Sequence, residues 1–299
     1  MNLLITGAGG QLGHELVRQC QEKGIGFSAP DRRMLDITDP AQVESALTAL
    51  MPSLVINGAA YTQVDRAETD AETAFAVNRD GAACLAEACA GYAIPLIHVS
   101  TDFVFDGQTD RPWRETDPVR PINIYGKSKA AGEAAIRSCL DRHIIVRTAW
   151  LYGSDGHNFV TTMLRLARER DCLRVVADQF GCPTAVTDLA EALLILAARI
   201  RVGGEIPWGI CHYCGGGITS WHGFADEIIR QARHYAPLRT RHVCPITTGE
   251  YPTPARRPSF SALDCSRIEN TFGIRPKPWR QRLTQVIQKI MQPKNHHRD

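Results

Sequence analysis

The segment that most constrains the fold of this chain lies near its start, where an apolar stretch runs into a cluster of glycines. Leu3–Ile5 is followed by Thr6-Gly7-Ala8-Gly9-Gly10-Gln11-Leu12-Gly13, and a helical pattern begins there. A strand that turns this sharply into a helix needs glycine, and the helix N-terminus offers free amides to a phosphate. Leu12 breaks the strict G-x-G-x-x-G form, so Gly7-x-x-Gly10-x-x-Gly13 remains. The pattern predicts a dinucleotide-binding turn; a turn without a ligand is the alternative.

The first half of the chain alternates short apolar runs with helical patterns, which is typical of βαβ units and a parallel sheet. The predicted strands cover residues 2–5, 26–29, 54–57, 96–100 and 144–147, and a later one covers 209–213. The predicted helices cover residues 11–23, 40–49, 71–91 and 125–139, and another starts from Ser220. We therefore expect an α/β protein with a Rossmann doubly wound parallel sheet.

The regular alternation fades from about residue 150, where loops rich in Pro, Gly and Arg appear. We expect residues 1–149 to form the nucleotide-binding domain and residues 150–299 to form a smaller domain that binds mainly the substrate. The segment Pro245–Pro258 is the richest of these loops, and we expect substrate specificity to reside there.

Composition and charge exclude several classes of protein. The 299 residues are 44% apolar, which is ordinary for a globular core, and the net charge of +2 is too small to indicate nucleic-acid binding. The basic tail Lys294–Arg298 is too short and scattered to act as a binding arm. No run of about 18 apolar residues predicts a membrane span, and no signal peptide precedes the first strand, so we expect a cytoplasmic protein.

The ten cysteines do not follow a zinc pattern, because the chain lacks two paired C-x-x-C units. Only Cys211-His212-Tyr213-Cys214 offers a candidate pair. Positions three apart in a strand face opposite sides, so these two thiols would not converge on one metal. We expect buried free thiols and no metal site.

A second motif, Tyr125-Gly126-Lys127-Ser128-Lys129, supplies candidate catalytic residues. Tyr125 and Lys129 are four residues apart and so share one helix face, while Thr101 follows a strand and so lies at the carboxyl edge of the sheet. Reduction of a ketone by a nicotinamide needs a proton donor, which Tyr125 could be, with the Lys129 ammonium favouring its phenolate. Thr101 could hold the carbonyl oxygen. A solvated helix face and a strand-end hydroxyl bound to backbone are the alternatives.

The glycine pattern and the Thr101, Tyr125 and Lys129 set resemble the extended short-chain dehydrogenase/reductase superfamily. From residue 2 to about residue 285 the chain is similar to dTDP-4-dehydrorhamnose reductases. The segments that carry this resemblance are Asn57-Gly58-Ala59-Ala60-Tyr61-Thr62, Val64-Asp65-Arg66-Ala67-Glu68, Ser100-Thr101-Asp102-Phe103-Val104-Phe105-Asp106-Gly107, Arg147-Thr148-Ala149-Trp150-Leu151-Tyr152-Gly153, Asp178-Gln179-Phe180-Gly181-Cys182-Pro183-Thr184 and Tyr251-Pro252-Thr253-Pro254-Ala255-Arg256-Arg257-Pro258.

The resemblance implies reduction of the C4 ketone of dTDP-4-dehydro-L-rhamnose by NADPH or NADH. It also implies that segments of the second half return to the nucleotide-binding sheet. Asp31 is placed to bind the ribose diol of NAD, whereas Arg32 and Arg33 could meet the phosphate of NADP or form only a solvated charge cluster. The residues expected along the cofactor are Gly7, Gly10, Gln11, Leu12, Gly13, Asp31, Arg32, Asp36, Ile37, Ala59, Ala60, Thr62, Tyr125 and Lys129.

On the substrate side we expect Thr101, Asp102, Trp150 and Arg257. A diphosphate needs cations, and the proline-flanked Arg256 and Arg257 are the best cluster. Trp150 matches by motif a tryptophan that contacts the substrate in the family, with a core aromatic as the alternative. Sugar-nucleotide dehydratases carry Glu directly after Thr-Asp; Phe103 stands there in this chain, which favours simple reduction.

Two other functions stay open at this point. A non-catalytic NADP-binding subunit, similar to the beta subunit of methionine adenosyltransferase, shares the resemblance, and so does a sugar-nucleotide epimerase with tightly held NAD. Some relatives bind magnesium at a dimer interface. Glu15 matches one of the ligands, but Thr187 stands where another is expected, so we predict no metal and leave a homodimer open.

Overall fold

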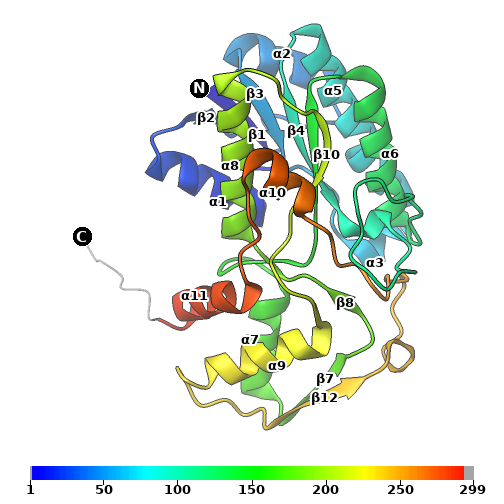
Figure 1. Cartoon of the computed structure of the whole chain (residues 1–299), viewed down its shortest axis with the longest axis vertical. Helices are drawn as coiled ribbons and strands as arrows, with labels where there is room; N and C mark the ends of the chain where they lie inside the picture. Colours follow the sequence, from blue (N-terminus) through cyan, green and yellow to red (C-terminus); the bar gives the residue numbers. More distant parts are fainter. Residues whose placement is uncertain (1, 293–299) are drawn as a thin grey trace.

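A single six-stranded sheet, parallel throughout, organises the larger part of the molecule in a computed structural model that describes residues 2–292 (Figure 1). The strand order is β10-β5-β4-β3-β1-β2, which confirms the doubly wound Rossmann arrangement. The basic tail at 294–298 lies outside the described residues. The strands of this sheet are β1 (Asn2–Thr6), β2 (Gly26–Ser28), β3 (Leu54–Asn57), β4 (Leu96–Thr101), β5 (His143–Thr148) and β10 (Gly209–His212).

Helices cover both faces of this sheet, because its central strands are apolar on both sides. Leu3, Leu4 and Ile5 of β1 are fully buried and pack into two separate cores. One core lies under α1 (Gln11–Glu22), α8 (Val186–Val202) and α10 (Ser266–Phe272). The other lies under α2 (Pro40–Leu50), α5 (Gly81–Gly91) and α6 (Ile124–Cys139).

Local signals set where the functional helices start. Asn123 caps α6 by accepting a hydrogen bond from Gly126 N at 2.7 Å, which places Tyr125 in the first turn of that helix. Asp39 caps α2 in the same way, with Pro40 at the first helical position. By contrast, the N-cap residue of α1 is Gly10, which has no side chain to accept a hydrogen bond. The first backbone N–H groups of α1 therefore stay free for a ligand.

The predicted helix at 71–91 is wrong in one respect, because α4 (Ala71–Phe75) and α5 are separated by a π-helical turn at Ala76–Asp80. Asn78 explains the interruption. Its side chain accepts from Tyr61 N at 2.8 Å and donates to Tyr61 O at 3.0 Å, which ties the helix to the loop after β3. A π-turn contains one extra residue, so it shifts the side chains that follow it around the helix axis. The pattern of apolar residues in the sequence does not indicate such a turn.

The second half of the chain builds a smaller layer and also returns to the main sheet. Helices α7 (Phe159–Glu169), α9 (Trp221–Ala232) and α11 (Trp279–Met291) enclose a third core, flanked by the parallel pair β7 (Cys172–Val176) and β12 (His242–Ile246) (Figure 1). β10, α8 and α10 belong to the larger part, so the two parts interleave and the division at residues 149 and 150 stays a prediction. The short elements are α3 (Val64–Ala67), β6 (Leu151–Tyr152), β8 (Phe180–Gly181), β9 (Thr184–Ala185) and β11 (Thr219–Ser220).

The structure also bears on the predictions made for the cysteines, for a metal site and for membrane-spanning helices. Cys211 and Cys214 are buried free thiols, as predicted. Within residues 2–292, no three His, Cys, Asp or Glu side chains are grouped to hold a metal, and the Glu15 carboxylate accepts from Arg18 Nε at 2.9 Å. No helix in this range is both long and apolar enough to cross a membrane.

Candidate active site

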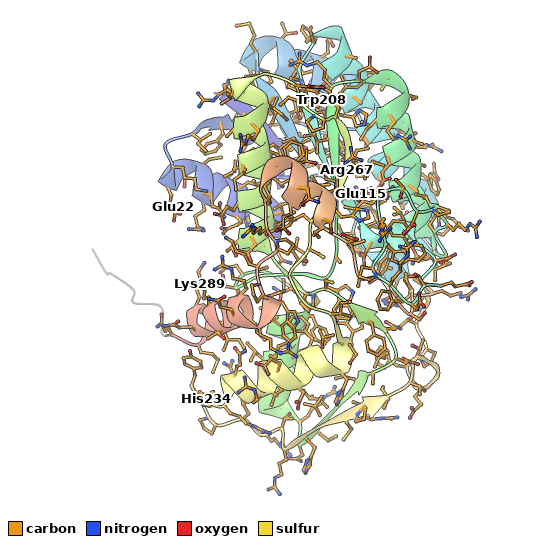
Figure 2. The ribbon with its side chains drawn as sticks, viewed as in Figure 1. Glu22, Glu115, Trp208, His234, Arg267 and Lys289 are labelled. Carbon is orange, nitrogen blue, oxygen red and sulfur yellow. The ribbon has the colours of Figure 1, made fainter. Side chains whose placement is uncertain are left out.

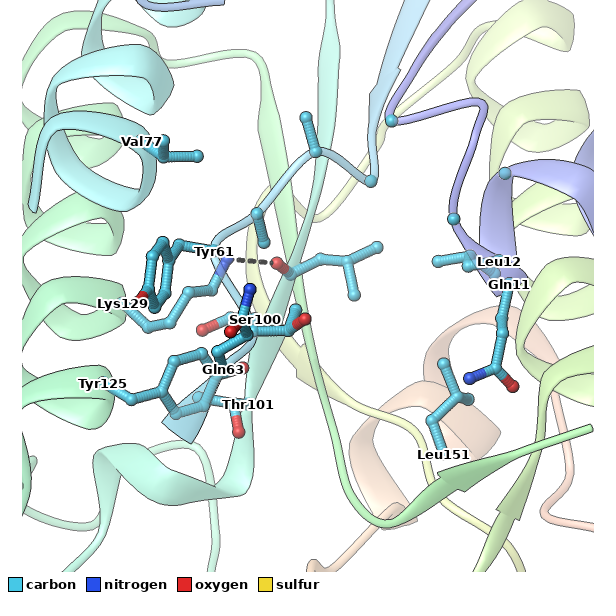
Figure 3. Close-up of a pocket in the computed structure, with 18 of the residues that line it drawn as sticks. Gln11, Leu12, Tyr61, Gln63, Val77, Ser100, Thr101, Tyr125, Lys129 and Leu151 are labelled. Carbon is cyan, nitrogen blue, oxygen red and sulfur yellow. Dashed lines mark hydrogen bonds between the residues drawn. The ribbon is translucent and has the colours of Figure 1, made fainter. Parts of the chain in front are cut away.

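A cavity of about 990 Å³ opens at the carboxyl edge of the sheet, between the larger and smaller parts of the molecule (Figure 3). Figure 2 shows the side chains of the two parts, with Arg267 on the larger and His234 and Lys289 on the smaller. Segments that follow β1, β3, β4 and β5 line it, and so do side chains from α6, α7 and α9. This is where doubly wound folds bind ligands. All of the predicted site residues except Arg257 line this one cavity. They are Gly7, Gly10, Gln11, Leu12, Gly13, Asp31, Arg32, Asp36, Ile37, Ala59, Ala60, Thr62, Thr101, Asp102, Tyr125, Lys129 and Trp150.

The glycine turn is shaped to let a phosphate approach the backbone. Gly7 has φ +72°, a conformation that favours glycine, and a Cβ on Gly13 would lie 2.3 Å from Gly7 O. Gly10 N donates to Gly7 O at 3.0 Å and closes the turn just before α1. The free amides at the start of α1 and the positive end of its dipole face the cavity side and suit a pyrophosphate.

The segment after β2 forms the far end of the cavity. Arg32 is largely exposed, with 74% of its side chain accessible, and its Nε lies 3.1 Å from Asp36 Oδ2. Asp36 also accepts from the backbone and hydroxyl of Thr38, and these contacts hold the pKa of its carboxyl below the usual value despite partial burial. Asp31 Oδ1 accepts from Arg33 N at 2.8 Å, so one oxygen of that carboxylate is used locally. Arg33 does not line the cavity.

The candidate proton donor sits at the middle of the cavity, where Tyr125 and Thr101 lie close together (Figure 3). Burial raises the pKa of the Tyr125 phenol to about 12, and the neighbouring Thr101 hydroxyl opposes that rise. The phenol therefore keeps its proton at neutral pH. Thr101 Oγ1 donates to Asp102 Oδ1 at 3.0 Å and accepts from Phe103 N at 3.2 Å.

Lys129 shares the helix face of Tyr125 but does not act on it as the sequence suggested. Its Nζ donates to Val99 O at 2.7 Å and lies 3.1 Å from His98 Nε2, so the amine is bound to β4 rather than to the phenol (Figure 3). Burial lowers the pKa of Lys129 to about 8. The expected lowering of the pKa of Tyr125 by an adjacent ammonium is therefore absent here, because desolvation dominates at both groups.

Asp102 lies on the cavity floor directly after Thr101 and is 3% exposed. Burial raises the pKa of its carboxyl to about 6, although hydrogen bonds from neighbouring groups oppose the rise. No second carboxylate follows it, since Phe103 stands next and packs its ring edge against Tyr125 at 5.8 Å between centroids. The acid/base pair that a dehydratase needs is thus not built here.

Three aromatic side chains line one side of the cavity, and one of them, Trp221, was not predicted from the sequence. Trp150 and Trp221 stack with ring centroids 3.5 Å apart and planes at 5°, and Phe159 packs against Trp221 at 4.6 Å. All three line the cavity. Trp221 is the first residue of α9, after the Ser220 cap, and nothing in its local pattern distinguishes it from a core aromatic.

Arg257 is the predicted residue that the structure places elsewhere. Its terminal nitrogens donate to both carboxylate oxygens of Asp65, at 3.0 and 2.7 Å, and to Ala255 O at 3.1 Å. This contact lowers the pKa of the Asp65 carboxyl and ties the loop at 247–258 to the start of α3. The donors expected to meet a diphosphate are thus occupied by a carboxylate, a partner that no sequence pattern indicated.

A buried ion pair links β5 to α6, the helix that carries Tyr125 and Lys129. Arg147 of β5 donates to Glu133 of α6 through Nε at 2.9 Å and through its terminal nitrogen at 2.6 Å. Their side chains are only 1% and 4% exposed, and Ser100 Oγ also donates to the Glu133 carboxylate. This pair fixes α6, and with it Tyr125 and Lys129, against the ends of β4 and β5.

The fold and this arrangement of glycine turn, threonine, tyrosine and lysine are those of the extended short-chain dehydrogenases/reductases. A family model described as the RmlD substrate binding domain matches residues 1–292. A dTDP-4-dehydrorhamnose reductase of Aggregatibacter actinomycetemcomitans is 44% identical over 290 residues, which cover 95% of this chain and 97% of the relative. The chain belongs to the RmlD family of dTDP-4-dehydrorhamnose reductases.

Solved structures agree with this membership. A dTDP-4-dehydrorhamnose reductase from Clostridium acetobutylicum is 38% identical, with a TM-score of 0.91 over 98% of this chain and 100% of that one. A second, from Bacillus anthracis and in complex with NADP, is 36% identical with a TM-score of 0.87, over 95% of this chain and 98% of that one. The similarity extends through both parts of the molecule.

Proposed function

We propose that this protein reduces the C4 ketone of dTDP-4-dehydro-L-rhamnose to dTDP-L-rhamnose with NADPH or NADH, the last step of dTDP-rhamnose biosynthesis. The observation that carries the proposal is the single cavity that joins a phosphate-binding turn to Tyr125 and Thr101. The family membership supports the choice of sugar nucleotide. The NADP bound to the Bacillus anthracis relative supports the choice of cofactor.

The residues around the cavity fit such a cofactor and a carbonyl substrate. Gly7, Gly13 and the uncapped start of α1 would hold the pyrophosphate, because a Cβ at Gly13 would fill the turn. The nicotinamide, when bound, supplies the hydride. Tyr125 donates the proton to the developing alkoxide, and its raised pKa ensures that the proton is present. The Thr101 hydroxyl, which donates to Asp102 Oδ1 in this structure, would turn to donate to the same oxygen and orient it.

The direct test supplies dTDP-4-dehydrorhamnose and NADPH to the purified protein and follows the loss of NADPH absorbance. We expect stoichiometric formation of dTDP-rhamnose, confirmed by mass spectrometry. A protein that carries tightly held NAD and interconverts sugar epimers without net NADPH loss would be an epimerase. NADPH binding without turnover of this substrate would favour a non-catalytic regulatory subunit.

Replacement of Arg32 by alanine should weaken NADPH binding more than NADH binding. Its guanidinium reaches the end of the cavity and can pair with a 2′-phosphate, a charge-assisted contact on the order of 1 kcal/mol at this exposure, or about fivefold in Kd. Fluorescence titration with both cofactors measures the effect, and Arg33→Ala serves as the matched control. Equal losses for NADPH and NADH would make Arg32 a surface charge without a cofactor role.

Replacement of Arg257 by alanine should raise the KM for the sugar nucleotide while NADPH affinity stays unchanged. We propose that Arg257 acts by holding its loop to Asp65, so Asp65→Asn should raise KM equally, about fivefold for a half-exposed pair of about 1 kcal/mol. Steady-state kinetics of Arg257→Ala and Asp65→Asn give the two KM values to be compared. A loss of about 10- to 150-fold in Arg257→Ala alone would instead establish a direct diphosphate contact.

We also propose that the protein binds a dTDP-sugar as its substrate, forms a homodimer and resides in the cytoplasm. Sedimentation velocity tests the oligomeric state, and fractionation of the source cells tests the compartment. A monomer at micromolar protein concentration would contradict the proposed homodimer and would leave the proposed reaction unaffected.

A further inference from the structure

Two cysteines lie in contact on the small sheet that β7 and β12 form. Cys172 Sγ and Cys244 Sγ are 2.7 Å apart, although 72 residues separate them along the chain. Both are free thiols; Cys172 is exposed and Cys244 is half-buried. Cys172 therefore departs from the expectation that the thiols of this chain are buried. Neither residue lines the cavity, so the proposed reduction does not account for their contact.

The register of the two strands explains why these thiols meet. β7 and β12 are parallel, with Cys172 opposite His242 and Cys244 opposite Arg174. Residues two apart on a strand share a face, so Cys172 and Cys244 are diagonal neighbours on the same face of the sheet. Leu173 points the other way, into the third core. The thiols thus lie on the outer face of a sheet at the lower end of the molecule in Figure 1.

A second pair of thiols shows why access to solvent matters. Cys214 Sγ and Cys265 Sγ lie 3.6 Å apart, but these residues are only 2% and 8% exposed and belong to one of the cores of the main sheet. A thiol exchanges with an external disulfide only if the attacking sulfur can reach it. Contact between sulfurs and access to solvent are combined at Cys172 and Cys244.

The hydrogen bond between the two sulfurs assigns them different roles. It raises the pKa of the Cys244 thiol above its usual value, and the charge of Arg174 opposes that rise. Cys244 is therefore the thiol that keeps its proton and donates it to the Cys172 sulfur. The thiolate is the form that attacks a disulfide. Exposure and the direction of the hydrogen bond both make Cys172 the attacking residue.

We propose that Cys172 and Cys244 form a reversible disulfide that locks β12 to β7 when the protein meets a low-molecular-weight disulfide such as oxidised glutathione. The Cys172 thiolate attacks one sulfur of oxidised glutathione, whose S–S bond breaks, and one glutathione thiolate leaves. The Cys244 thiolate then attacks Cys172 Sγ in the mixed disulfide and expels the second. Two protein thiols lose two electrons and two protons, and one oxidised glutathione gains them to become two reduced glutathiones.

The lock acts on a part of the fold that has a single strand pair. A sheet of two strands is weak by itself, and β12 leads directly into the loop at 247–258, which Arg257 ties to Asp65. The disulfide would close 72 residues of chain and so restrict the unfolded state. We therefore expect oxidation to raise the Tm on the order of 5 °C. In a reducing compartment such a bond forms transiently, when oxidant accumulates.

Mass spectrometry of the full-length protein gives the direct test, which does not depend on activity. After incubation with oxidised glutathione we expect the loss of two hydrogens, a peptide pair that joins Cys172 to Cys244, and full reversal by dithiothreitol. Cys172→Ser and Cys244→Ser should each abolish the loss. Cys84→Ser, which removes a half-buried thiol on α5, is the matched control and should still form the bond. A wild type that keeps both thiols free, or that holds only glutathione adducts, would overturn the proposal.

Thermal unfolding followed by circular dichroism tests the lock itself. The oxidised wild type should have a higher Tm than the reduced wild type, and Cys172→Ser treated in the same way should show no such difference. Equal Tm values for the oxidised and reduced wild type would overturn the locking role. Both tests concern only the thiols, so their outcome is independent of whether the proposed reduction holds.

Discussion

Replacement of Tyr125 by phenylalanine should lower kcat by about 10²- to 10⁴-fold, the loss expected when a general acid is removed. The substitution deletes the one hydroxyl on this helix face that can protonate the alkoxide and removes little of the cavity surface. The cofactor Kd should therefore stay nearly unchanged. Single-turnover kinetics with NADPH, paired with fluorescence titration of the cofactor, measure the two quantities separately.

A matched control for Tyr125 is available in the same cavity. The Tyr61 hydroxyl donates to Asp70 Oδ2 at 3.2 Å, so its proton is already used and Tyr61→Phe should keep most of the wild-type kcat. If Tyr125→Phe retained more than about a tenth of the wild-type kcat, another group would have to be the proton donor.

Replacement of Glu133 by alanine should reduce the free energy of unfolding by about 3–5 kcal/mol, because it leaves the Arg147 guanidinium buried without a counterion. The Ser100 hydroxyl would lose its acceptor at the same time. Urea unfolding followed by circular dichroism gives the value. Since the pair anchors α6 under Tyr125, we expect kcat to fall as well in the fraction that stays folded.

Surface ion pairs of the same type provide the contrast. Arg165 and Glu169 pair across one turn of α7, with 61% and 52% of their side chains exposed. Glu169→Ala should cost less than about 1 kcal/mol, because solvent screens that pair. A loss below about 1 kcal/mol for Glu133→Ala would mean that water or a side-chain rearrangement compensates the buried arginine.

Much of the fold could be predicted from the sequence because its signals are local. The strands at Asn2–Thr6 and Leu54–Asn57 contain the continuous apolar runs 3–5 and 54–56, which are typical of buried parallel strands. The caps at Asp39 and Asn123 use residue types that favour helix starts. The spacing of Tyr125 and Lys129 predicted a shared helix face, and both residues line the cavity, while their catalytic roles stay a prediction.

The features that the sequence did not reveal depend on partners far along the chain. Arg257 meets Asp65 across 192 residues, and Trp221, at the start of α9 in the smaller part, stacks on Trp150, which follows β5 in the larger part. Spacing within one segment carries no information on such pairs. The contacts of the Lys129 amine are hidden for the same reason, since it meets His98 and Val99 O in β4.

The position of β10 has a consequence for how the protein is made. β5 is buried along its whole length, yet sixty residues separate its end from β10, the strand that covers its outer edge. Ribosomes add about 5–20 residues per second, so β10 is synthesised roughly 3–12 s after β5. During that time β5 has an uncovered hydrophobic strand edge, the kind of surface at which nascent chains aggregate. Slow translation between the two strands would therefore prolong a state in which chaperones are most needed.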